Sequence, residues 1–250
     1  MIPMPMKILI IFLITASIAF SQTAAEWKKK GDALESSGKT KQALEAYEKA
    51  LEKEPKDADI LVKVAKQYGD LMPSLKGKER EKAGESSLEY SRKAVALAPN
   101  SSDPHLAVAL SLGKNTEFMG NKEKIEASRE MKAEAKKALE LDPKSDYAHH
   151  MLGRWHQEMA DIGGFARLAA KVIYGGVPKG SYEEALDHFD KARNLNGKRL
   201  IHQIEYGRTL AMMGRENDAR REIKKGLAMP NKEADDAESK TRGRATLNDL

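Results

Sequence analysis

A lysine followed by alanine or glycine recurs along this chain at the end of successive helical patterns. The spacings between successive pairs are 44, 44, 54 and 34 residues. One period of 34 residues, with insertions of ten, ten and twenty residues in the first three intervals, accounts for all four. After each of the first three pairs a proline ends the helix and leads into the next one. The pairs are Lys49-Ala50, Lys93-Ala94, Lys137-Ala138, Lys191-Ala192 and Lys225-Gly226.

Small residues occupy one equivalent position in each period, where they let two helices of a hairpin approach closely. Larger residues such as Trp27, Tyr68 and Leu152 then fill the space between neighbouring hairpins. No hairpin buries its apolar face alone, so the hairpins must stack into one continuous core. We expect an all-α fold, a right-handed α-solenoid of about five helical hairpins with insertions and a C-terminal capping helix. The small residues are Gly31, Ala65, Ala109, Gly153 and Gly207.

This pattern resembles the tetratricopeptide repeat, and the resemblance covers nearly all of the chain after residue 21. In the first unit the matching residues are Trp27, Gly31, Gly38, Ala43, Tyr47, Ala50 and Pro55. In the last unit they are Gly207, Gly214, Ala219 and Pro230. The resemblance implies a single solenoid domain at residues 22–250. We expect its units at about 24–57, 58–101, 102–145, 146–199 and 200–233, with the cap at 234–250.

The first 21 residues are predicted to be a secretory signal peptide. Lys7 supplies a positive start, residues 8–20 are an apolar run, and Ala19 and Ser21 are small residues before a cut ahead of Gln22. We therefore expect an exported protein, periplasmic or secreted, with no transmembrane span after cleavage. The alternative is a chain held at a membrane by an uncleaved N-terminal segment, although the apolar run is shorter than the roughly twenty residues that span a bilayer.

Composition narrows the classes of function. The chain has 43 basic and 38 acidic residues, a net charge of +5, and the two signs are interspersed, so we expect no nucleic-acid partner. It has no cysteine, which excludes disulfides, thiolate zinc sites and cysteine nucleophiles. His149 and His156 are about two helical turns apart at core positions of the repeat, so we interpret them as packing residues. No catalytic motif is present, and we expect no enzyme activity, no cofactor and no metal.

The three insertions differ in character. Residues 70–84 and 114–130 are rich in lysine and glutamate, so we expect them to lengthen their hairpins with solvated turns. Residues 161–180 are more apolar, with Ile162, Phe165, Leu168, Ala169 and Ile173 on one stripe. We expect a helix at about 161–173 whose apolar stripe packs against the solenoid. A turn at 175–180 and a capping box of Ser181 with Glu184 should then start the next helix.

The central stretch resembles the regulator of microtubule dynamics family. The resemblance is carried by LGRW at residues 152–155, Ala160, Arg167, the turn at Tyr174-Gly175 with Pro178, and YEEAL followed by FDKA at 182–192. It is specific over about residues 130–230. The tetratricopeptide domains of that family are associated with microtubules or with lipid exchange at membrane contact sites. The predicted secretory signal differs from the cytosolic or membrane-anchored setting of the family's named members.

The ninth residue of each first helix is expected to face the concave surface of the solenoid. Counting along the units places Asp32, Lys66, Leu110, Arg154 and Arg208 there. His150 lies one turn before Arg154, and Lys114 reaches the same region, so we expect positive potential in the groove. We predict a binding site at Lys66, Lys114, His150, Arg154 and Arg208. The alternative is that Arg154 and Arg208 pair with local acids such as Glu158 and Glu205.

Two classes of function remain open. The first is a non-enzymatic scaffold that binds a protein or peptide partner in its concave groove, since solenoids present extended surfaces. The second is a carrier of lipid or another small ligand, in which residues 161–180 close one end of the groove into a pocket. An acidic peptide or a phospholipid headgroup would supply the anion that the predicted arginines hold.

Overall fold

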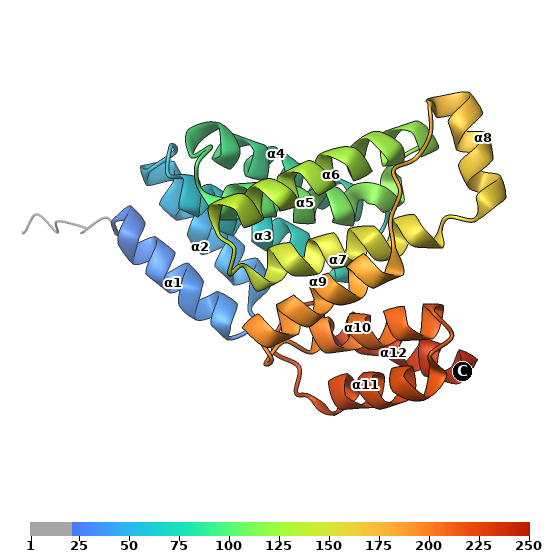
Figure 1. The fold of residues 1–250 in the computed structure, drawn as a ribbon. Coiled ribbons are helices and arrows are strands. Elements are labelled where there is room, and N and C mark those ends of the chain that lie inside the picture. The colour runs from blue at the N-terminus through green and yellow to red at the C-terminus, as the bar shows by residue number, and fades with distance from the viewer. Residues whose placement is uncertain (1–21) are drawn as a thin grey trace, which may run out of the picture.

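The structure is a computed structural model that describes residues 22–250, and the predicted signal peptide at 1–21 lies outside the described residues. Over that range it consists of helices joined by short turns (Figure 1). The first six long helices are α1 (Ala24–Ser36), α2 (Thr40–Lys53), α3 (Ala58–Leu71), α4 (Gly77–Leu97), α5 (Ser102–Asn115) and α6 (Asn121–Leu141). The others are α7 (Asp146–Asp161), α8 (Gly164–Tyr174), α9 (Tyr182–Leu195), α10 (Leu200–Met212), α11 (Glu216–Ala228) and α12 (Asp236–Asp249).

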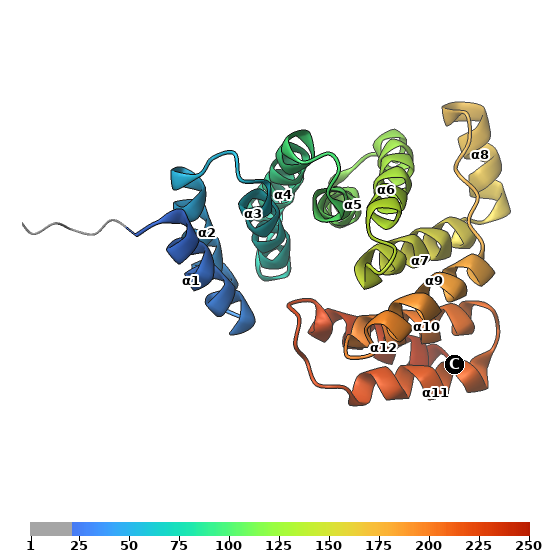
Figure 2. The ribbon, with the colours of Figure 1, turned by 60° about the vertical axis from the view of Figure 1, so that its left-hand side comes forward.

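The helices pair into successive hairpins, which confirms the predicted α-solenoid. The pairs in residues 22–250 are α1 with α2, α3 with α4, α5 with α6, α7 with α9, and α10 with α11, and α12 packs against the last pair. Figure 2 shows the pairs following one another along a curved path, so that α1 and α11 lie on facing sides of it. Among the described residues, no helix is apolar over a length that would cross a membrane.

Close approach inside each hairpin explains the small residues of the repeat. A Cβ atom added at Gly31 would lie 2.5 Å from the Tyr47 ring, and one at Gly153 would lie 2.8 Å from the Phe189 ring. Both rings are fully buried and could not move aside without opening the core. The absence of a side chain at Gly31 and Gly153 therefore sets how closely the two helices of these hairpins pack.

The main core lies between the second and fourth hairpins. Val108, Leu112, Leu152 and Trp155 pack together there, and each is at least 95% buried. The indole Nε1 of Trp155 donates a hydrogen bond of 2.7 Å to the backbone oxygen of Ser128, so the ring is buried without an unsatisfied donor. Hydrophobic burial and this bond join α5, α6 and α7 into one layer.

The first two insertions lengthen their hairpins, as expected. α4 and α6 have 21 residues each, against 14 in α2, and short 3-10 turns at Met72–Ser74 and Thr116–Phe118 lead into them. The side-chain amide of Asn115 donates a hydrogen bond of 2.8 Å to the backbone oxygen of Gly84. This contact ties the start of the second insertion to the lengthened part of α4.

The third insertion forms the expected helix, α8, but its packing was predicted wrongly. No residue of α8 is buried, and Phe165 and Leu168 are 88% and 61% exposed. Both views show α8 standing away from the other helices (Figures 1 and 2). The expected turn follows it, with Gly175 in the left-handed conformation, and the Ser181 hydroxyl accepts a hydrogen bond from the backbone of Glu184 to start α9.

The C-terminal segment returns toward the concave side before it ends in the expected capping helix. The Asp236 carboxylate accepts hydrogen bonds of 2.7 and 2.9 Å from the backbone of Lys232 and Glu233, which folds residues 231–235 into a tight turn. In α12, Ser239 and Gly243 are buried, and Gly243 faces Ile204 and Ile223. The cap thus covers apolar side chains of α10 and α11 that no sixth hairpin covers.

Candidate functional site

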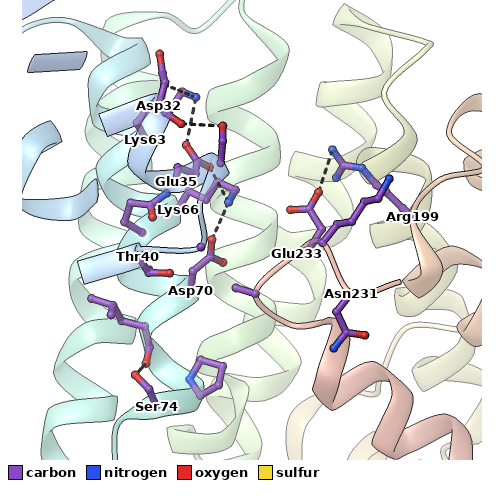
Figure 3. Close-up of a pocket in the computed structure, with 17 residues that line it drawn as sticks. Asp32, Glu35, Thr40, Lys63, Lys66, Asp70, Ser74, Arg199, Asn231 and Glu233 are labelled. Atoms are coloured by element: carbon purple, nitrogen blue, oxygen red, sulfur yellow. Dashed lines mark hydrogen bonds and ion pairs between the residues drawn. The ribbon is translucent and has the colours of Figure 1, made fainter. Parts of the chain in front are cut away.

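The concave side holds a groove made of three cavities that share lining residues. We call them the N-terminal cavity of about 720 Å³, the central pocket of about 220 Å³ and the C-terminal cavity of about 370 Å³. The N-terminal cavity lies between α1, α3 and residues 231–234 (Figure 3). The central pocket has apolar walls from Val62, Leu106 and Leu110, and the C-terminal cavity reaches α7 and α12.

Charged side chains of alternating sign run along one wall of the groove. The Lys63 ammonium lies 3.1 Å from Asp32 and 3.5 Å from Glu35. Lys66 lies 2.8 Å from Glu35 and 2.7 Å from Asp70. We call these residues, with Lys114, the charge ladder, because Lys114 continues it at 3.1 Å from the other oxygen of Asp70. Each lysine of the ladder is therefore already matched by a carboxylate.

Tyr47 supports the acidic side chains of the ladder from the core of the first hairpin. Its hydroxyl is 2.8 Å from Asp32 and 2.7 Å from Glu35, and its ring is fully buried. Burial alone would raise the pKa of Glu35, but the Lys66 charge and hydrogen bond, the Tyr47 hydroxyl and Lys63 together lower it to about 2. Glu35 is thus an anion at every physiological pH, and the ladder keeps its charges.

The turn at 231–235 forms the opposite wall (Figure 3). Glu233 lies 3.9 Å from Arg199, which also pairs with Asp146 at 3.2 Å. Asp235 lines both the central pocket and the C-terminal cavity. Burial is the main reason that the pKa of Asp235 is raised; Lys114 opposes the shift and Asp70 adds to it. One acid of this wall therefore sits close to the lysine that ends the ladder.

Three arginines converge on one buried carboxylate at the C-terminal end. Glu205 is fully buried, and its oxygens lie 3.0 Å from Arg154, 2.6 Å from Arg208 and 3.2 Å from Arg242. Burial would raise the pKa of Glu205, but the three guanidinium groups hold it far below its usual range. Arg154 also forms an ion pair with Glu158. The alternative considered for Arg154 and Arg208, pairing with Glu158 and Glu205, is what the structure contains.

His150 is not a surface cation. It is only 3% exposed, and its Nδ1 lies 3.0 Å from Nδ1 of His202, whose Nε2 contacts Asp146 at 3.0 Å. Burial, followed by the charge of His202, holds the pKa of His150 well below its usual range, so the ring is neutral. His150 lines the back of the C-terminal cavity as a packed ring, and it contributes no charge there.

The predicted site residues are therefore only partly brought together. Lys66 and Lys114 both line the central pocket, and His150, Arg154 and Lys114 line the C-terminal cavity. Arg208 lines none of the three cavities, since it points at Glu205 and Thr246. The N-terminal and C-terminal cavities are each lined by four acidic and four basic side chains, so neither lining carries the expected excess of positive charge.

Sequence reasoning missed the residues that the C-terminal segment contributes, namely Asn231, Lys232, Glu233, Asp235, Glu238 and Arg242. Counting along the repeat identifies positions on first helices only, and this segment follows the last repeat. The acidic pair Asp235-Asp236 is a sequence signal in this segment. That pair marks a helix start but does not indicate which surface the preceding turn covers.

His149, His156 and His188 form a separate packed group. His188 lies between His149, at 3.1 Å between Nδ1 atoms, and His156, with which it stacks at 5.8 Å. Burial and then the charges of His149 and His156 lower the pKa of His188 to about 4. Within residues 22–250 no group of three histidine or carboxylate side chains is placed to hold a metal ion.

Comparison with known proteins then decides the family. The family model described as regulator of microtubule dynamics protein 1-3 matches residues 27–250, which is nearly the whole described chain. The chain belongs to this family. The match extends well beyond the stretch at 130–230 on which the resemblance was first recognised. No protein with a curated description matches the chain.

Solved structures support the fold of this family member. A tetratricopeptide repeat protein of Thermus thermophilus, TTC0263, has 16% identity and a TM-score of 0.65, with 90% of this chain and 99% of that one covered. PilF of Pseudomonas aeruginosa has 17% identity and a TM-score of 0.56, with coverage of 90% and 87%. At such identities the likeness shows the fold alone. This member of the regulator of microtubule dynamics family is a tetratricopeptide-like helical repeat scaffold.

Proposed function

We propose that the chain is a non-enzymatic, exported scaffold that binds an extended peptide segment of a protein partner in its concave groove. The observation that carries this proposal is the continuity of the groove, whose three cavities share lining residues from α1 to α12. An extended peptide fits a long, open groove better than a compact ligand does. The proposed site contains Lys66, Lys114 and Arg154, with His150 as a packed wall and Arg208 holding Glu205 behind it.

The charge ladder supports a peptide of mixed charge that includes carboxylates. Lys66 and Lys114 are 42% and 31% exposed, so their ammonium groups are accessible from the groove while they stay paired with Asp70. A carboxylate of the peptide would add a second anion to Lys114 and a third to Lys66. Basic residues of the peptide would meet Asp32 and Glu35. Because the linings hold equal numbers of acidic and basic side chains, we expect no special advantage for a strongly acidic peptide.

The geometry does not favour the lipid-carrier alternative. Residues 161–180, which that alternative uses to close the groove, line none of the three cavities. Export is part of the proposal on the strength of the signal-like residues 1–21. It is tested by intact mass of the chain recovered from its host, where a start at Gln22 supports it and a start at Met1 contradicts it.

The groove proposal is tested by selecting peptides from a displayed random library and measuring their affinities by calorimetry. The double variant Lys66→Ala with Lys114→Ala should bind the selected peptides at least about tenfold more weakly. A second variant, Ser74→Trp, fills the mouth of the N-terminal cavity without removing an ion pair and should weaken binding similarly. The matched control is Lys93→Ala with Lys191→Ala, which removes two paired lysines from outside the groove.

Circular dichroism should show that all three variants stay folded. If no peptide is selected, or if the selected peptides bind the groove variants as tightly as the control, the groove is not a peptide site. Loss of binding in the control as well would show that the selected peptides recognise surface charge in general.

A further inference from the structure

Helix α8 has its polarity reversed relative to an ordinary surface helix. Its apolar side chains face solvent: Phe165 is 88% exposed, Val172 81%, Ile173 66% and Leu168 61%. Among the described residues, only three other large hydrophobic side chains are exposed. Each lies on a different helix, and none is more than 45% exposed. Exposed apolar surface is thus concentrated on this one element, where it costs solubility and marks an interaction site.

The polar face of α8 points toward the protein instead. The Arg167 guanidinium donates hydrogen bonds to the backbone oxygens of Met159 and Pro178. It therefore links the segment that leads into α8 to the segment that leads out of it. Phe165 and Val172 lie on the opposite side, because neighbouring residues of a helix are about 100° apart. The contacts of Arg167 therefore hold the apolar face outward.

The base of the insertion is fixed in other ways. Arg129 of α6 donates a hydrogen bond of 2.9 Å to the backbone oxygen of Gly176. A Cβ atom at Gly180 would lie 2.4 Å from the backbone oxygen of His156, so the returning chain presses directly on α7. Tyr182 closes the base with a hydrogen bond of 3.1 Å to Asp161. These contacts fix the position of α8 relative to α6 and α7.

The charges of the insertion have one sign. Residues 162–180 contain Arg167, Lys171 and Lys179 and no acidic residue. Neither Lys171 nor Lys179 forms an ion pair within residues 22–250. An apolar face of Phe, Leu, Val and Ile flanked by unpaired lysines is the pattern of helices that lie in the interface of a membrane.

We propose that α8 docks the protein onto an anionic membrane surface. The helix lies in the plane of the interface, with Phe165, Leu168, Val172 and Ile173 among the acyl chains and Lys171 and Lys179 at the headgroups. Because α8 lies outside the groove, this surface is separate from the proposed peptide site and remains available when that site is occupied.

Area and charge favour a lipid surface over a second copy of the chain. The four apolar side chains together expose on the order of 500 Å², less than the roughly 800 Å² that each partner buries in a stable protein interface. A symmetric dimer through α8 would also bring the exposed Lys171 and Lys179 of each copy together. Anionic headgroups, in contrast, attract both lysines.

The absence of cysteine permits a direct test on the full-length chain. A single cysteine, Val172→Cys, is labelled with an environment-sensitive fluorophore and mixed with vesicles of phosphatidylglycerol and phosphatidylcholine. We expect a blue shift and a several-fold rise in emission at low salt, and much less with phosphatidylcholine alone. The label reports the surroundings of α8 itself, whatever another part of the chain does. A label at Lys224→Cys, exposed on α11, should not respond.

Substitutions in the labelled chain separate the two contributions. Lys171→Glu with Lys179→Glu should remove the response to anionic vesicles, and Phe165→Ser with Leu168→Ser should reduce it about tenfold or more. The matched control, Leu97→Ser with Leu195→Ser, removes two exposed leucines from other helices and should leave it unchanged. All of these positions are exposed, so circular dichroism should show unchanged folding.

Two outcomes would overturn the proposal. The first is a label on α8 that stays in water with anionic vesicles at low salt. The second is a chain that sediments as a dimer without lipid and becomes a monomer on Phe165→Ser with Leu168→Ser, which would assign the face to a second copy.

Discussion

Glu205 shows how much of a side chain's surroundings depends on segments that are far away in the sequence. Its pairing with Arg154 and Arg208 was foreseeable, because all three residues belong to first helices of neighbouring repeats. The third partner, Arg242, lies on the capping helix, which is not part of a repeat and whose position no spacing rule predicts. The burial of His150 was missed for another reason, because a count of positions along one helix does not show that the ring of His202, on the neighbouring α10, packs against it.

The substitution Glu205→Gln tests the energetic role of this carboxylate. Removing its charge leaves three guanidinium groups close together with one partner fewer, and breaking a buried pair in this way costs about 3–5 kcal/mol. We expect the free energy of unfolding, measured with urea, to fall by about 3 kcal/mol. Glu238→Gln removes an exposed partner of Arg242 and should cost less than about 1 kcal/mol. Equal losses in the two variants would contradict this view of Glu205.

The pH dependence of stability should reveal the charge ladder. The pKa of Glu35 is lowered from 4.5 to about 2 in the folded chain, so the unfolded chain binds the proton first as the pH falls. Its contribution is therefore complete above pH 4.5 and is lost as the pH falls toward 2. Unfolding free energies measured from about pH 6 to about pH 2 should fall less steeply for Glu35→Gln than for the exposed control Glu52→Gln. Parallel curves would show that Glu35 is not held by the ladder.

At the scale of whole elements, periodicity predicted helices more reliably than it predicted their surroundings. The insertion at 161–180 carries a true apolar stripe, and the helix forms where that stripe indicates. An apolar stripe does not indicate whether it packs against its own protein or against another molecule. The prediction that it packs against the solenoid was wrong. The direction of the stripe is set by the contacts of Arg167 with Met159 and Pro178, which sequence periodicity does not identify.

Because the apolar face of α8 is exposed, apolar-to-charged substitutions there should cost little stability. Phe165→Asp with Leu168→Asp places two carboxylates in solvent, where they leave no cavity and lose little packing. We expect the melting temperature to change by no more than about 2 °C. The same exchange at Leu112 and Leu152, which are almost fully buried, should prevent stable folding. A large fall in melting temperature for the α8 variant would mean that the helix packs against the solenoid after all.

For the whole molecule, the repeat period was sufficient to predict the stacking of the hairpins. The family to which the chain belongs was predicted from the motifs at residues 152–192. The repeat period was sufficient to predict a concave groove but not the full lining of that groove, since one wall comes from the turn at 231–235. Repeats specify contacts between neighbours, whereas this wall depends on the accumulated curvature of every unit before it.

That dependence sets a limit on how the architecture can change. An open solenoid tolerates gain or loss of a unit, because each repeat meets only the next. Here residues 231–234 stand opposite α1 and α3 only after the path has turned through all the intervening hairpins (Figure 2). Deleting or duplicating one internal hairpin would carry that turn away from the first unit and abolish the N-terminal cavity. The number of repeats is thus a property of the groove, as much a part of it as any residue that lines it.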